Sequence, residues 1–235
     1  MDNIKHCLEF TIGILVSVSL TNLIIGTSVG VWLANKKTVF SRILETLITL
    51  PLIFPPIAFG FFMISLLGRD SLIGYGLLKI FNVNIIFSQY GVFLGSFISG
   101  FPLMVKSVKT SALSIDQSIM EMARIQGANQ FDLFLYILLP NLSKGICAGM
   151  ILSASRSLGE VGMCMLLGGN IQGKTETISL AIFNAVFEGD IMKATLLSTI
   201  LIVISLLFFT LISQFEKEDE NVQCRSFLSG NTHRF

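Results

Sequence analysis

The sequence predicts an all-α integral membrane protein with five transmembrane helices, and three observations lead to this fold class. Hydrophobic residues make up 52% of the 235-residue chain and charged residues only 13%. A soluble domain carries about 25% charged residues, so about half of the usual charge is missing. The mean hydropathy is +0.76, and the apolar residues gather in blocks of the ~20 residues that a helix needs to cross a bilayer. These features exclude a soluble globular domain.

Five apolar segments of 16 to 25 residues are read as spans. The first is too long for the apolar region of a signal peptide, so we expect it to be retained. The second contains three prolines, which remove backbone donors and predict a kink. The predicted spans are residues 10–34, 44–67, 90–105, 142–158 and 194–212.

Two stretches between these spans are read differently. Residues 68–88 carry glycines and a charged pair and are expected to form a loop. The apolar piece 178–187 is too short to cross a bilayer, and we expect a re-entrant or interfacial helix there.

The distribution of lysine and arginine predicts an orientation. With the N-terminus outside, ten of the 16 Lys and Arg residues lie on the cytoplasmic side. Three of these, Lys36, Lys37 and Arg42, lie in a short loop, where the positive-inside rule is most reliable. Five spans place the termini on opposite sides, so the C-terminus is expected in the cytoplasm and the tail 216–235 is expected to be disordered.

Signals for other functions are absent from the sequence. The net charge is +1, and no basic arm indicates a nucleic-acid partner. The four cysteines lack metal-ligand or redox spacing, so no metal or cofactor is expected. Neither His6 nor His233 lies near a carboxylate cluster, so no catalytic residue is assigned.

The most polar stretch in the middle of the chain, residues 106–131, is expected to carry a short helix outside the membrane. Asp116 or Ser114 can cap its N-terminus, and Gly127 can end it. One mostly apolar face is formed by Ile119, Met122, Ala123 and Gln126. Such a helix suits docking into a groove of a partner protein, although an ordinary surface helix would show the same periodicity.

The residues of this stretch resemble the coupling-loop signature of ATP-binding cassette (ABC) importer permeases, EAA-x3-G-x9-I-x-L-P. Glu121, Ala123 and Gly127 match, and after nine residues Ile137, Leu139 and Pro140 match as well. Met122 replaces the usual Ala, and both residues favour a helix. Five further stretches resemble other parts of molybdate permease sequences: residues 50–56, 67–74, 101–105, 155–162 and 170–175. Over residues 10–215 the chain is identified as a member of the molybdate/tungstate permease family, with sulfate permeases as near relatives.

This resemblance implies a MetI-like permease fold, with a permease domain at 1–215 and a coupling loop at 106–141. It implies three partners: a second copy of the chain, cytoplasmic ABC ATPase subunits and an extracytoplasmic oxyanion-binding protein. The residues implied in ATPase coupling are Glu121, Ala123, Arg124, Gly127, Ala128 and Pro140. No G-x-x-x-x-G-K-[ST] sequence is present to hold ATP phosphates, so we expect a transport subunit of the cell membrane and no ATPase site.

The expected cargo is molybdate or tungstate, with sulfate or thiosulfate as the alternative; a non-ABC channel or secondary transporter would leave the coupling motif unexplained. Arg156 and Glu160 lie four residues apart and can pair on one helix face, either to attract an anion or to brace the fourth span. Serine hydroxyls nearby either line a pathway or permit close packing. The candidate pathway or gate residues are Arg156, Ser157, Glu160 and Met163.

Overall fold

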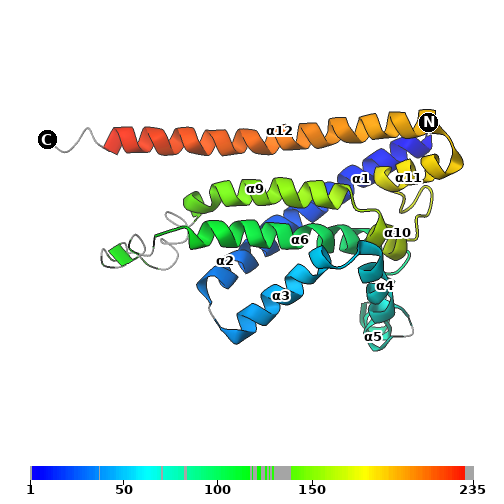
Figure 1. Cartoon of the computed structure of the whole chain (residues 1–235), viewed down its shortest axis with the longest axis horizontal. Coiled ribbons are helices and arrows are strands. Elements are labelled where there is room, and N and C mark those ends of the chain that lie inside the picture. The colour runs from blue at the N-terminus through cyan, green and yellow to red at the C-terminus, as the bar shows by residue number, and fades with distance from the viewer. Residues whose placement is uncertain are drawn as a thin grey trace.

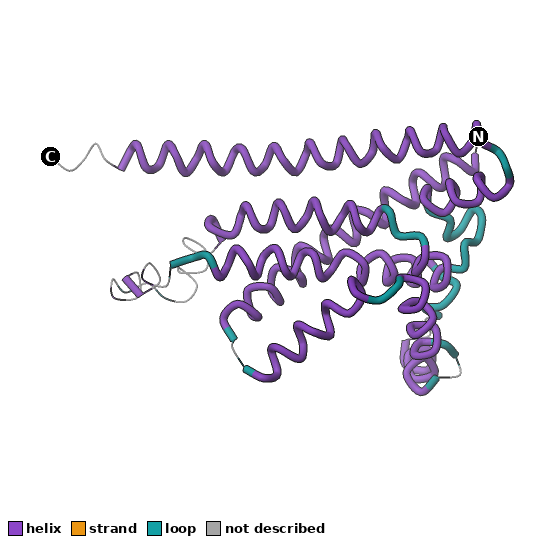
Figure 2. The backbone as a smooth tube through the Cα atoms, viewed as in Figure 1, coloured by secondary structure: helices purple, strands orange, loops and turns teal. Residues whose placement is uncertain are grey.

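The computed structural model describes residues 2–36, 38–69, 71–81, 84–116, 118, 121–122, 125, 127, 129 and 139–230. All regular structure in these residues is helical, and they contain no strand (Figure 2). The helices form an elongated bundle with the N-terminus at one end (Figure 1). The predicted all-α architecture is confirmed.

The first predicted span is a long helix with one widened turn. α1 (Asp2–Thr21) leads through the π-helical turn η1 (Asn22–Gly26) into α2 (Thr27–Asn35). Asn22 is fully buried, and its Nδ2 donates to Ser153 Oγ at 2.7 Å. Close backbone approach and buried polar bonds of this kind are typical of packed membrane helices.

The second predicted span is broken at its prolines into α3 (Val39–Ile53) and α4 (Pro56–Leu67). Phe54, at the break, has an extended backbone. The cause is the proline pair 55–56, because a residue that precedes proline avoids the helical region and proline itself has no N–H to donate. The predicted kink is therefore a complete interruption of the helix.

The segment 68–88, expected to be a loop, contains α5 (Leu72–Phe81). Two glycines inside this helix, Gly74 and Gly76, weaken its signal in the sequence, because glycine costs about 1 kcal/mol relative to alanine in a helix. The glycine at 74 also fits its surroundings, since a Cβ there would lie 2.5 Å from the carbonyl oxygen of Leu67.

The centre of the bundle is formed by α6 (Gln89–Leu113) and α9 (Leu139–Leu158), which pack along each other. A Cβ on Gly100 would lie 2.5 Å from Ser157 Oγ, and a Cβ on Gly145 would lie 2.5 Å from Ser111 Cβ. The two backbones are thus as close as glycine allows, which is how membrane helices gain packing energy. α6 runs past residue 105, the predicted end of its span, because lysine and serine can continue a helix beyond the apolar region.

The C-terminal third contains three more helices. α10 (Gly162–Gly168) follows α9 after a 60° bend, and α11 (Ile178–Glu188) is the short helix predicted at 178–187. α12 (Ile191–Gly230) holds the last span and continues through residues 216–230, where a disordered tail was expected. That stretch has no proline and several good helix formers, which explains the continuation.

In the described part of the chain, three helical segments are long and apolar enough to cross a membrane: Ile4–Asn35, Gln89–Leu113 and Ile191–Gln214. The bent pair α9–α10 makes a fourth if it counts as one span. The remaining predicted span, residues 44–67, corresponds to α3 and α4, each too short to cross alone. The total of five stays a prediction in which the broken pair crosses the membrane together.

Candidate functional site

The first candidate site is the stretch between α6 and α9, residues 114–138, which we call the coupling segment. Its described residues lie at the end of the bundle opposite the N-terminus, the end towards which α12 runs (Figure 1). Asp116 Oδ1 accepts a hydrogen bond from the Ser118 N–H at 2.9 Å. Ser114 Oγ instead donates to the Ser111 carbonyl at the end of α6. Of the two proposed caps, Asp116 is therefore the one that caps the following turn.

The hydrogen bond to Asp116 also affects its acidity. The Ser118 backbone N–H, together with the Ser118 side chain, lowers the pKa of the fully exposed Asp116 carboxyl below its ordinary value of 3.8. A hydrogen bond donated to a carboxylate favours its charged form, and a charged N-cap also interacts favourably with the helix dipole. The cap is thus ionised at neutral pH.

The described coupling residues present their side chains to the outside. Glu121 and Met122 are helical and exposed, and Met122 keeps 60% of its surface and Ile125 86%. Met122 and Ile125 are therefore exposed apolar side chains within a polar segment. Ala123, Arg124 and Ala128, which the motif also assigns to coupling, lie outside the described residues, as do Ile119 and Gln126.

Two residues of the motif, Gly127 and Pro140, differ from other residues in the backbone conformations open to them. Gly127 has φ +90°, and a Cβ there would meet nothing within 4 Å. The left-handed backbone, rather than space, therefore requires glycine at this turn. Pro140 lies in α9, and the residues directly before Leu139 lie outside the described part of the chain.

The second candidate site is centred on Glu160, in the bend between α9 and α10. Its side chain is 1% exposed and forms an ion pair with Arg156 Nη1 at 2.9 Å. Glu160 Oε2 also accepts from Ser99 Oγ on α6 at 3.0 Å, and Oε1 accepts from the Met163 N–H of α10 at 3.0 Å. One carboxylate thus joins three helices and holds the 60° bend.

The surroundings of Glu160 determine what the predicted pathway residues can do. The cavity beside it measures about 10 Å³, room for roughly one water molecule and not for a tetrahedral oxyanion. Ser157 is buried and donates to the Ser96 carbonyl at 2.7 Å, which is a packing role. Met163 is completely buried, whereas the Arg156 side chain remains 34% exposed. Of the four predicted residues, Arg156 offers the most accessible charge.

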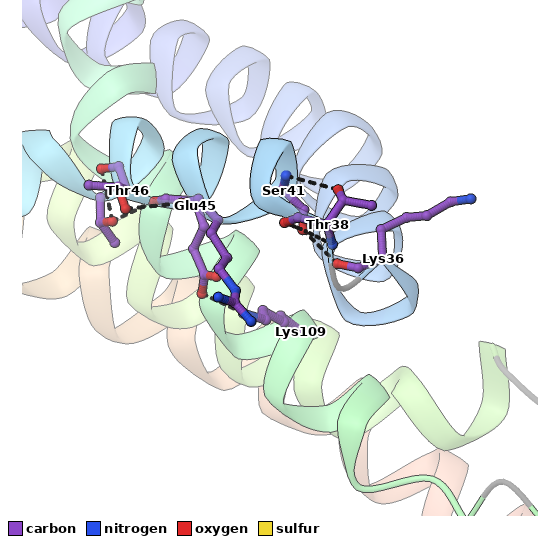
Figure 3. Close-up of polar contacts among 8 residues, drawn as sticks. Lys36, Thr38, Ser41, Glu45, Thr46 and Lys109 are labelled. Carbon is purple, nitrogen blue, oxygen red and sulfur yellow. Dashed lines mark hydrogen bonds and ion pairs between the residues drawn. The ribbon is translucent and has the colours of Figure 1, made fainter.

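One ion pair was not anticipated from the sequence. Glu45 on α3 pairs with Lys109 Nζ on α6, near the end of α6 that leads into the coupling segment (Figure 3). Both side chains are partly buried, with 34% and 21% exposed. The available signal was Glu45 itself, an ionisable residue inside an apolar segment, which is by default a functional candidate.

Comparison with known proteins defines the class to which this architecture belongs. Residues 26–217 match the family of binding-protein-dependent transport system inner membrane components. The chain belongs to this family, and it is an integral inner-membrane permease component of an ABC importer.

Particular relatives agree with this class. The molybdenum transport system permease protein ModB of Haemophilus influenzae is 35% identical over 75% of this chain and 79% of that protein. ModB of Escherichia coli K12 is 31% identical over 80% and 84%. Sulfate transport system permeases are also similar, at 26–30% identity. A crystal structure of a bacterial ABC transporter that imports the polysaccharide alginate shares the fold, with a TM-score of 0.67, 15% identity and coverage of 93% and 80%.

Proposed function

We propose that this chain is the permease subunit of an ABC importer that carries molybdate or tungstate into the cytoplasm. The observation that carries the proposal is the motif from Glu121 to Pro140, of which Glu121 and Met122 are helical and exposed and follow the Asp116 cap at one end of the bundle. The identities to proteins named molybdenum transport permeases support the choice of cargo. The chain itself is a transport subunit without an ATPase site.

The coupling segment is the proposed docking site for a cytoplasmic ABC ATPase. Met122 and Ile125 supply apolar contacts to a groove in that subunit, and Gly127 makes the turn that ends the docked helix. When the two ATPase subunits close, the coupling segments move with them and the spans tilt, which exposes the pathway first to one side and then to the other.

The anion pathway is proposed to lie between two copies of the chain. The small cavity beside Glu160 supports this, because it has no room for an oxyanion within the protomer. Arg156 is proposed to face the passing anion with the guanidinium donors that Glu160 does not use. Glu160 and Ser157 hold its helix in place, and Met163 closes the packing behind it.

The proposed orientation has the N-terminus outside, where a binding protein would deliver the anion. The arrangement in Figure 1 supports it, since the N-terminus and the coupling segment lie at opposite ends of the bundle. Lys36 follows α2, whereas Arg42, which was expected in the loop, lies in the first turn of α3. The positive-inside rule favours a cytoplasmic position for this end of the two helices.

The experiment is anion uptake into proteoliposomes that contain the permease, its ATPase and its binding protein. We expect ATP-dependent uptake of molybdate that tungstate competes with and excess sulfate does not. The Gly127→Asp variant is expected to insert normally and to abolish uptake. Uptake of sulfate without uptake of molybdate would show that the proposed cargo is wrong. Normal ATPase coupling in Gly127→Asp would contradict the role of the coupling segment.

A further inference from the structure

The ion pair between Glu45 and Lys109 connects two helices that are otherwise loosely joined. Figure 3 shows the Glu45 carboxylate on α3 pointing at the Lys109 ammonium on α6. Among the residues of α3 only Ser41 and Pro51 are buried, so the helix has little packing to hold it. A partly buried charge pair is screened less by solvent than a fully exposed one, so it constrains the two helices more strongly.

The start of α3 is fixed to α2 by a compact set of bonds. Thr38 Oγ1 accepts from the Ser41 N–H at 3.2 Å, and Ser41 Oγ accepts from the Thr38 N–H at 3.1 Å. Ser41 Oγ also donates to the Lys36 carbonyl at 2.7 Å (Figure 3). These bonds join the N-terminal turn of α3 to the end of α2.

α2 is in turn held against α6 at the level of Lys109. A Cβ on Gly30 would lie 2.9 Å from Val108 Cβ and 3.0 Å from the Val105 carbonyl oxygen. These bonds and contacts thus join the end of α2, the start of α3 and the last turns of α6. Lys109 lies four residues before Leu113, where α6 ends and the coupling segment begins, so a movement of the coupling segment reaches Lys109 through one helical turn.

The other end of α3 leads towards the second candidate site. After the break at Phe54, α4 packs on α10, where a Cβ on Gly60 would lie 3.0 Å from Leu166 and 3.3 Å from Met163 Cα. α10 is the helix that Glu160 holds through the Met163 N–H. α3 and α4 therefore connect the coupling-segment end of α6 with the Glu160 bend.

We propose that Glu45 and Lys109 are positioning residues that transmit movement of the coupling segment to α3, and through α4 to α10. This inference rests on the proposed function, since it assumes that an ATPase moves the coupling segment. Without the pair, α6 and α3 can move independently, so ATP hydrolysis continues while anion movement lags behind it. A pair that only braced the fold would change stability and leave this ratio unchanged.

The test measures ATP hydrolysed per molybdate transported by the full reconstituted complex. Glu45→Gln and Lys109→Gln are compared with the charge-swapped double variant Glu45→Lys/Lys109→Glu and with wild type. The matched control is Glu9→Gln, which removes the exposed Lys5–Glu9 pair at the other end of the bundle. Size-exclusion chromatography of each purified permease checks that it is folded before reconstitution.

We expect each single variant to raise the ratio of ATP to molybdate roughly tenfold, within the 5–150-fold range of typical coupling between sites. The swapped variant should return to within about twofold of wild type, because the attraction is restored, and Glu9→Gln should match wild type. If the single variants do not fold, the charge-swapped variant alone decides. A swapped variant that folds and keeps the wild-type ratio of ATP to molybdate supports the inference, and one that folds with a raised ratio overturns it.

Two results distinguish this inference from the proposed function. No ATP-dependent uptake of molybdate, tungstate or sulfate by the wild-type complex would refute the proposed function. Uptake by wild type with unchanged ratios in Glu45→Gln and Lys109→Gln would refute only the transmission role. Failure of the swapped variant to fold together with the single variants would assign the pair to folding and also overturn the inference.

Discussion

Replacing Glu160 by glutamine tests how strongly the bend between α9 and α10 depends on one carboxylate. Oε1 accepts from the Met163 N–H, and Oε2 accepts from Ser99 and pairs with Arg156. An amide has only one oxygen. Because the Ser99 hydroxyl can accept as well as donate, the best arrangement keeps the oxygen at Met163 and turns the NH₂ towards Arg156.

The stabilising interaction that is lost is therefore the one with Arg156, because its positive charge then faces the NH₂ of the glutamine. Removing one partner of a buried pair costs about 3–5 kcal/mol, but Arg156 is 34% exposed and can turn partly to water. We expect a destabilisation of about 2–3 kcal/mol for Glu160→Gln, between that value and the ~1–3 kcal/mol of an unsatisfied buried group. For a chain of this size the corresponding fall in melting temperature is roughly 4–12 °C.

The assay is thermal unfolding of the purified permease in detergent, with Glu9→Gln as the matched control. Glu9 also pairs four residues away, with Lys5 at 3.9 Å, but these side chains are 67% and 76% exposed. Exposed i,i+4 pairs of this kind contribute about 0.3–0.5 kcal/mol, so the control should melt within ~2 °C of wild type. Equal shifts in the two variants would refute the view that Glu160 holds the bend.

Three further predictions concern backbone packing and the coupling segment. Gly145→Ala is expected to lower the free energy of unfolding by about 1–3 kcal/mol through overpacking, because its Cβ would lie 2.5 Å from Ser111 Cβ. Adding Ser111→Gly should recover most of the lost melting temperature. No recovery would contradict the close α6–α9 contact. Gly127→Ala should weaken binding of the ATPase more than Gly127→Asn does, because asparagine tolerates a positive φ. A pull-down with the ATPase measures this binding. Equal binding of the two variants would count against a required left-handed turn. The Asp116 pKa lies below 3.8, so its cap contributes stability above pH 3.8 that is lost as the pH falls through the lowered pKa; a carboxyl-carbon NMR titration of the full chain giving 3.8 or higher would disprove the cap.

Hydropathy predicted the helices that lie in the membrane more successfully than those outside it. The segments 10–34 and 194–212 were recognisable because they lie in helices long and apolar enough to cross a bilayer, which requires long apolar runs. The extension of α6 to Leu113 was missed, because polar composition shows where an apolar environment ends and not where helical hydrogen bonding ends. α5 was missed because its glycines weaken the helical signal.

The candidate sites were predictable to different degrees. The coupling motif is contiguous in the sequence, so Glu121 and Gly127 could be placed together, and Arg156 and Glu160 could be paired from helical spacing alone. The contribution of Ser99 to the Glu160 site depends on which turn of α6 faces the bend, and the partner of Glu45 is 64 residues away in Lys109. Such long-range contacts are set by helix packing, which a single sequence does not reveal.

The π-helical turn η1 sets the rotational phase of the first span. Each residue turns an α-helix by about 100°, and a π-helical turn takes up about one residue more than an α-helical turn does. Asn22 at its start faces Ser153 on α9, whereas Gly26 at its end and Gly30 in α2 face α6. Removing one residue from this turn would rotate α2 by about 100° relative to α1 and point a side chain at α6 where Gly30 now lies. The extra residue thus allows one continuous helix to contact two different neighbours with its two halves.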